Sequence, residues 1–165
     1  MDSRKLRIAT GVLSLYIAFV FVQSLFFKFS DSPETQHIFG TLNAWALSLG
    51  LPGVFARSGI FSHYVIGSAE LVASLLLLAG LVTGRVLLQG AGALLSLGVI
   101  SGAIFFHLFT PLGVVVVNAD GSRDGGELFI LACGVWLASA VILVLRRKLL
   151  IAVLPMLRRN RNAVA

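Results

Sequence analysis

The sequence contains few charged residues and almost no cysteine. Of its 165 residues, only 12% are Asp, Glu, Lys or Arg, against about 25% in an average soluble domain. The single cysteine, Cys133, has no partner for a disulfide or a dithiol relay within the chain. These shortages exclude a disordered chain and a disulfide-rich secreted domain.

Apolar residues take the place of the missing charges. They make up 58% of the chain, where about 45–50% is usual, and the mean hydropathy is +0.97. The net charge of +6 does not indicate nucleic-acid binding, because the basic residues stand at the ends of apolar runs and not along one face. We therefore expect one membrane domain and no nucleic-acid partner.

Four apolar runs are long enough to cross a hydrocarbon core, which takes about 20 helical residues. The predicted fold class is all-α, a membrane four-helix bundle. The first run follows basic residues but is too long for a signal peptide and lacks a small-x-small cleavage site, so we expect a retained helix. The expected spans are residues 6–29, 61–82, 86–109 and 127–145, within a transmembrane domain over residues 1–148.

The distribution of Lys and Arg predicts the orientation, since cytoplasmic loops carry an excess of both. Both termini are expected to be cytoplasmic, in a bacterial or archaeal inner membrane, with segments 30–60 and 110–126 outside. Three basic residues fall on the outer side, Lys28, Arg57 and Arg123. Ten fall on the inner side: Arg4, Lys5, Arg7, Arg85, Arg146, Arg147, Lys148, Arg158, Arg159 and Arg161.

Residues 33–49 are predicted to form an amphipathic helix outside the membrane core. Ser32 and Pro33 are a favourable N-cap and N1 pair, while Asp31 and Glu34 offer a competing capping box. The segment is too short to span, so it is expected either to lie along the outer interface as an anchor or to cover the bundle as a lid. Its apolar residues recur at helical spacing: Ile38, Phe39, Leu42, Trp45, Ala46 and Leu49.

Two further segments lie outside the spans. The run 114–117 followed by Asp120 and Gly121 predicts a short hairpin. The basic tail 149–165 is expected to lie on the anionic inner leaflet.

Polar residues within spans are informative because each costs free energy unless it is paired or hydrated. They gather in the outer half of the predicted bundle. The inner half offers only Thr10, Ser14, Thr83, Gln89 and basic ends that are expected to be exposed. The asymmetry predicts a site near the outer leaflet.

Glu70 is the strongest candidate. A carboxylate at that depth must pair with a cation or be held protonated, and Lys28 is its nearest candidate partner. The alternative is a structural clamp that holds the first two spans in register. Lys28 could instead only extend to the outer headgroups.

Other outer-side residues complete the candidate site. His107 could donate to a quinone carbonyl or shuttle a proton, or it could be an ordinary interfacial histidine. Glu127 could act directly, but Asp124 and Glu127 also form a helix-capping pattern. We assign catalytic candidacy to Glu70, Lys28 and His107, and ligand-binding candidacy to Gln23, Ser101 and Glu127.

No metal site is predicted. His37, His63, His107 and Glu127 are all on the outer side, but no pair has helical ligand spacing and no cysteine joins them. A bis-histidine haem site with His63 and His107 has no specific support.

Several segments together resemble the DoxX family of small four-helix membrane proteins. They are Phe27-Lys28-Phe29, the run 67–78 around Glu70, the run 103–108, and Asp124-Gly125-Gly126-Glu127. The resemblance covers about residues 8–147. It implies a role in membrane redox systems, since members include a subunit associated with an archaeal quinol oxidase and the membrane subunit of a thiosulfate:quinone oxidoreductase.

The chain also departs from that pattern. It has a long outer amphipathic segment and a basic tail, and it has no cysteine on the outer side, which argues against thiosulfate chemistry by this chain alone. The four-helix plan is also similar to that of cargo receptors and assembly factors.

The favoured functional hypothesis is a quinone-interacting subunit of an oxidoreductase system. Lys28 or His107 would hydrogen-bond a carbonyl and Glu70 would exchange the accompanying proton. Enzyme activity is left open, because a partner must supply the electron-carrying group. Quinone is the only cofactor candidate, and the expected partners are the bilayer, a membrane or peripheral oxidoreductase and a second copy of the chain.

Two other hypotheses stay open. One is a non-catalytic scaffold or assembly factor whose buried polar residues only specify the bundle. The other is a small-solute or ion carrier, which is less favoured because the inner halves of the spans contain no evident polar route.

Overall fold

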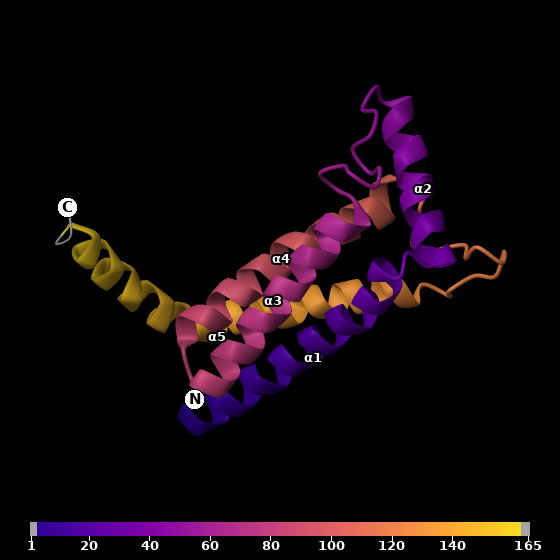
Figure 1. The fold of residues 1–165 in the computed structure, drawn as a ribbon. Coiled ribbons are helices and arrows are strands. Elements are labelled where there is room, and N and C mark those ends of the chain that lie inside the picture. The colour runs from indigo at the N-terminus through magenta and orange to yellow at the C-terminus, as the bar shows by residue number, and fades with distance from the viewer. Residues whose placement is uncertain (1–2, 163–165) are drawn as a thin grey trace.

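The computed structural model describes residues 3–162, which form an all-helical fold. Four helices are long and apolar enough to cross a membrane, as the sequence predicts. The second span begins two residues later than expected, because Ser62 is its N-cap and accepts a hydrogen bond from Val65 N. The helices within the described range are α1 (Ser3–Phe29), α2 (Pro33–Ser48), α3 (His63–Thr83), α4 (Val86–Phe109) and α5 (Glu127–Asn162) (Figure 1).

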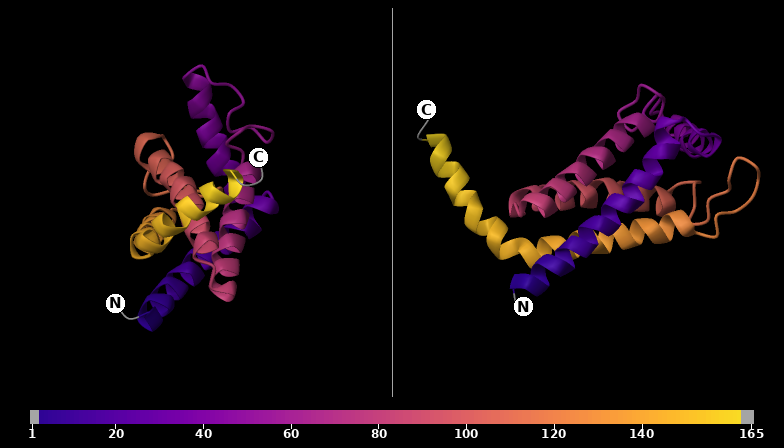
Figure 2. Two further views of the ribbon diagram at one scale, coloured as in Figure 1. Left: turned by 90° about the vertical axis from the view of Figure 1, so that its left-hand side faces the viewer. Right: turned by 60° about the horizontal axis from the view of Figure 1, so that its bottom comes forward.

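The four long helices form an antiparallel bundle in the order α1, α3, α4, α5. Both α1 and α4 pack against α3 and α5, whereas α1 and α4 barely touch. The two ends of the bundle differ in their residues. We call one the α2 end, where α2 and the two long loops lie (Figures 1 and 2). We call the other the basic end; in the described part of the chain it carries Arg4, Lys5, Arg7, Arg85, Arg146, Arg147 and Lys148.

The core contains apolar side chains from all four long helices, with Ile17, Phe21, Leu77, Val135 and Ile142 at its centre. Large apolar side chains are also exposed around the outside of the bundle, as expected for a surface in contact with lipid. They include Phe19, Phe26, Leu75, Leu94, Ile130 and Val144.

Two glycines bring α3 and α4 into close contact. A Cβ on Gly80 would meet the backbone of Gln89, and a Cβ on Gly92 would lie 2.8 Å from Leu77 N and 3.0 Å from Ala73 O. Small residues at helix interfaces allow such approach in membranes, where association depends on packing. The α3–α4 turn follows directly, with Gly84 in the left-handed conformation that ends α3 (φ 68°).

The predicted amphipathic helix is α2, which runs from Pro33 to Ser48. Its N-cap is Ser32, whose hydroxyl accepts a hydrogen bond from Thr35 N, so the Ser-Pro interpretation is correct and the competing capping box does not form. A small cluster packs α2 onto the loop before α3 and onto the end of α4. It contains Leu42, Ala46 and Phe55, with Phe106 and Leu112 against them.

The predicted hairpin is present between α4 and α5. Val117 and Arg123 form an antiparallel bridge, and Gly121 has a φ of 83° in the turn. Hydrogen bonds from the Ser122 hydroxyl and amide hold the pKa of Asp120 below its usual value. Asp124 caps α5, because its carboxylate accepts from the backbone amides of Val116, Gly126 and Leu128.

Helix α5 continues to Asn162, through the segment expected to be a separate tail. Figures 1 and 2 show its C-terminal part turning away from the other helices. The last three residues of the predicted tail, 163–165, lie outside the described residues.

We predict that Gly92→Ala destabilises the protein while Gly98→Ala, on the same helix, does not. The new methyl at Gly92 overlaps Leu77 and the Ala73 carbonyl, whereas a Cβ at Gly98 has nothing within 4 Å. Overpacking of this kind costs about 1–3 kcal/mol, and Gly to Ala in an open helix position is neutral or favourable. Thermal unfolding in mild detergent measures both, and equal midpoints for the two variants would contradict the close α3–α4 contact.

Candidate functional site

The central feature of the α2-end half is an ion pair between Lys28 of α1 and Glu70 of α3. Lys28 Nζ lies 3.1 Å from Glu70 Oε1 and 3.0 Å from Oε2. Ser24 lies between the two helices; its hydroxyl donates to Glu70 Oε2 at 2.7 Å and accepts from Lys28 Nζ at 2.7 Å. The side chains of Lys28 and Glu70 are only 16% and 7% exposed. The pairing expected from the sequence is therefore present, and Lys28 does not simply extend into solvent.

Local sequence explains why the two side chains meet. Glu70 lies seven residues after the start of α3, about 10 Å along the helix at 1.5 Å per residue. Gly67 precedes it by one turn, and a Cβ there would lie 3.3 Å from Phe29, 3.4 Å from Leu25 and 3.5 Å from Lys28. The missing side chain thus allows α1 to approach α3 at the level of the ion pair.

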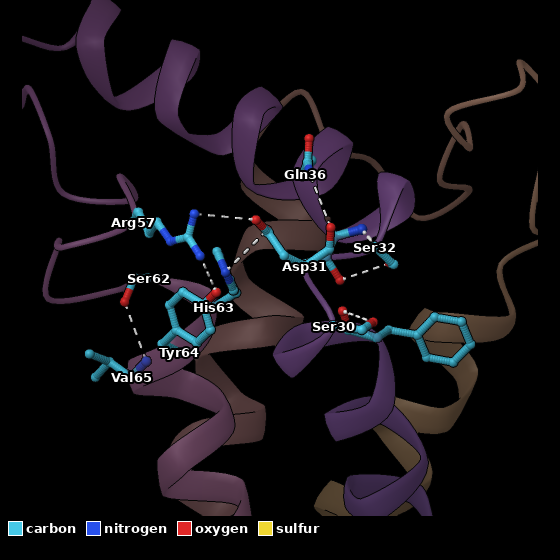
Figure 3. A network of polar contacts seen from close by, with 11 residues as sticks. Ser30, Asp31, Ser32, Gln36, Arg57, Ser62, His63, Tyr64 and Val65 are labelled. Atoms are coloured by element: carbon cyan, nitrogen blue, oxygen red, sulfur yellow. Dashed lines mark hydrogen bonds and ion pairs between the residues drawn. The ribbon is translucent and has the colours of Figure 1, made fainter.

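A second polar network joins the end of α1 to the start of α3 (Figure 3). Asp31 Oδ1 lies 3.3 Å from His63 Nε2, too poorly aligned for a hydrogen bond, and Asp31 Oδ2 lies 3.7 Å from Arg57. Arg57 also donates to the Tyr64 hydroxyl at 2.7 Å and lies over its ring. Asp31 has a φ of 54°, the only positive value for a described residue other than glycine, which aims its carboxylate at α3.

The network of Asp31 and the ion pair are neighbours. Asp31 N donates to the Lys28 carbonyl, and the Phe29 and Tyr64 rings stack at 6.4 Å. His63 and Glu70 are seven residues apart, so they share the buried face of α3. Sequence analysis considered His63 only as a metal or haem ligand, although this spacing could have linked it to Glu70.

The remaining candidate residues lie elsewhere. His107 is buried and its Nδ1 lies 2.7 Å from the Gly113 carbonyl, so it fastens the loop after α4. Ser101 is exposed and accepts a hydrogen bond from Trp136. Gln23 and Glu127 are exposed, and among the described residues neither side chain takes part in the hydrogen bonds or the ion pair of Lys28 and Glu70. Of the six candidate residues, Lys28 and Glu70 are the two that the structure brings together, and they are joined by Ser24, a polar residue of the first span that was not assigned to the site.

The basic end also contains a buried polar cluster, which the sequence analysis missed. Arg146 was expected to be exposed, but it is buried between α1, α4 and α5. Its Nε donates to Gln89 Oε1 at 3.0 Å and its Nη2 donates to Thr10 Oγ1 at 2.9 Å. The sequence did contain an indication of this cluster, because Gln89 and Thr10 lie within the inner halves of the spans and need polar partners inside the bundle.

Within residues 3–162, no three His, Cys, Asp or Glu side chains come together in a way that could hold a metal ion. The chain matches no protein-family model, no curated protein and no solved structure. None of these comparisons supports the DoxX resemblance, which stays an expectation from the sequence.

We predict strong coupling between Lys28 and Glu70 in a double-mutant cycle. Lys28→Met or Glu70→Gln alone leaves one buried charge without its partner, which costs about 3–5 kcal/mol. The double variant removes both charges and should be much less destabilised than the sum of the two. Unfolding in detergent measures each step, with Glu127→Gln as the matched control on an exposed glutamate, expected within about 0.5 kcal/mol of wild type. Additive effects would mean that the ion pair does not hold α1 to α3.

Proposed function

We propose that this chain is a quinone-interacting subunit of a membrane-associated oxidoreductase system, of the DoxX type. The observation that carries the proposal is the Lys28–Glu70 pair, a cation and a carboxylate 3.0 Å apart inside an apolar bundle. Acidic residues are rarely spent within membrane spans unless they take part in proton, ion or ligand chemistry.

The pair offers both groups that a quinone carbonyl needs. The Lys28 ammonium can donate a hydrogen bond to the oxygen. The Glu70 carboxylate can accept one of the two protons released when a quinol is oxidised and, once protonated, can return one when a quinone is reduced; the second proton is exchanged with the partner protein or water. Ser24 touches both groups and can keep one partnered while the other engages the ligand. The stacked rings of Phe29 and Tyr64 lie beside the pair and suit a flat headgroup.

Electrons must come from another protein. Quinone reduction to the quinol consumes two electrons and two protons, and the chain's single cysteine cannot serve as a dithiol donor. A membrane or peripheral oxidoreductase is therefore part of the proposal.

The orientation follows from the charges at the two ends of the bundle. We infer that the basic end faces the cytoplasm, with both termini inside, because Lys and Arg are concentrated there. The ion pair then lies in the outer half of a bacterial or archaeal inner membrane. The exposed Leu47, Leu49 and Ile60 favour contact of α2 and its following loop with the outer interface, while the packing on Phe106 favours a covering role.

A non-catalytic scaffold is the second candidate. It is favoured by the complete pairing of Glu70, whose two oxygens both have partners within the chain. A clamp of this kind fixes the register of α1 and α3 without any ligand.

We predict that quinone co-purifies with the wild-type protein in mild detergent and native lipid, and that Glu70→Gln and Lys28→Met lower its content at least several-fold. Both variants remove a group that contacts the ligand, while Glu127→Gln changes an exposed glutamate in the same way and should keep wild-type content. Extraction followed by chromatography gives the quinone-to-protein ratio, and added quinone tests rebinding.

Stability separates this from the scaffold. The scaffold replaces the redox subunit in either of two cases. In the first, neither the wild type nor any variant contains or takes up quinone. In the second, Glu70→Gln and Lys28→Met lower the unfolding temperature but leave the quinone content unchanged.

A further inference from the structure

The buried guanidinium of Arg146 is the least expected charge in the structure. The residue is 9% exposed, and α1, α4 and α5 enclose it through hydrogen bonds to Thr10 and Gln89. Gln89 is itself held by the Ser14 hydroxyl at 2.9 Å and by the Thr10 carbonyl at 3.3 Å. The polar shell is therefore well ordered and positions the guanidinium.

Every one of these partners is uncharged. No carboxylate of the described residues forms an ion pair with Arg146. Glu70 is also far from this cluster. Gly80 of α3 lies against Gln89, and Glu70 is ten residues before Gly80, which places Glu70 about 15 Å along α3 from the level of Gln89. The described acidic residues all belong to the α2-end half: Asp31, Glu34, Glu70, Asp120, Asp124 and Glu127.

Nearby charges increase the imbalance. Arg7 lies one turn before Thr10 on α1, and the exposed Arg147 and Lys148 follow Arg146 in the sequence. A buried cation without a counter-charge costs several kcal/mol, and one that faces other cations costs more. An anion from outside the chain would remove this cost.

We propose that Arg146 forms a binding site for the phosphate of an anionic phospholipid headgroup at the basic end of the bundle. Guanidinium has five N–H donors in a planar fork that matches phosphate oxygens, and only two of the five are used in the hydrogen bonds to Gln89 and Thr10. The site lies at the basic end of the bundle, where Arg146, Arg147 and Lys148 follow the apolar part of α5. Such basic runs lie at the level of the headgroups. Basic sites between transmembrane helices bind such lipids.

The site does not depend on the quinone proposal. It lies at the opposite end of the bundle from Lys28 and Glu70, and its ligand carries no redox chemistry. A lipid bound at this site is expected to hold α1, α4 and α5 together.

The test measures lipid binding to the full chain by native mass spectrometry and by thermal shift in detergent. Phosphatidylglycerol, phosphatidylcholine and inorganic phosphate are the probes. We expect phosphatidylglycerol to bind and stabilise the wild type, and Arg146→Gln to lower its affinity at least tenfold. Arg147→Gln removes the same charge from the adjacent exposed position and should change affinity less than threefold.

Each alternative gives a different result. Equal losses for Arg146→Gln and Arg147→Gln would reduce the effect to general surface charge and overturn the proposal. If inorganic phosphate stabilises the protein as much as phosphatidylglycerol does, the site binds a free anion, and the proposal of a lipid ligand is overturned.

Two further variants complete the design. Asp2 lies outside the described residues, and a gain of lipid affinity in Asp2→Asn would identify it as the counter-charge and overturn the proposal. Should Arg146→Gln fail to fold, Arg146→Lys keeps the charge but loses the fork; we expect a several-fold loss of affinity, and unchanged affinity would overturn the proposal.

Discussion

The cost of placing charge inside an apolar bundle is the constraint on which the structure depends. A charged side chain in hydrocarbon must find partners within the protein or at the headgroups. Lys28 and Glu70 meet this requirement by pairing across α1 and α3, and Arg146 meets part of it by hydrogen bonding across α1, α4 and α5. Between them these contacts link all four long helices, so polar side chains as well as the apolar core hold the bundle together.

The two polar clusters are separated by the centre of the core. Ile17, Phe21 and Leu77 are fully buried between them, and the buried hydroxyls of Ser74 and Ser96 donate to carbonyls of their own helices. A hydroxyl used in this way does not extend a hydrogen-bonded path through the bundle. The arrangement therefore disfavours the carrier hypothesis, even though the basic half contains more buried polarity than the sequence suggested.

Hydropathy and residue type predict a large part of this structure. The four spans follow from run length, and the Lys28–Glu70 contact follows because one acid and one cation occupy matching depths in successive spans. Arg146 could not be recognised in the same way. A basic residue at the end of a span is usually exposed, and its burial here depends on Thr10 and Gln89, which are 136 and 57 residues away in the chain.

Loop geometry accounts for the other differences between the structure and the sequence-based predictions, which concern His63 and His107. The Asp31–His63 contact requires a left-handed backbone at Asp31, which a residue other than glycine seldom adopts and no local pattern announces. The position of His107 suggested a ligand, but the Gly113 carbonyl six residues later occupies its Nδ1. In both cases the decisive partner is set by how the chain turns after a helix ends.

The surroundings of the ion pair bear on how a ligand would reach it. At the α2 end, Asp31 contacts His63 and Arg57 (Figure 3), and its backbone amide donates to the Lys28 carbonyl. On the lipid-facing side, Phe26 and Phe27 are exposed on the last turns of α1. A water-soluble molecule that approaches from the α2 end would meet the Asp31 network, whereas a molecule dissolved in the bilayer would meet exposed apolar side chains such as Phe26 and Phe27. Approach from the bilayer would therefore suit a lipid-soluble ligand, such as the proposed quinone, better than a solute from the aqueous phase.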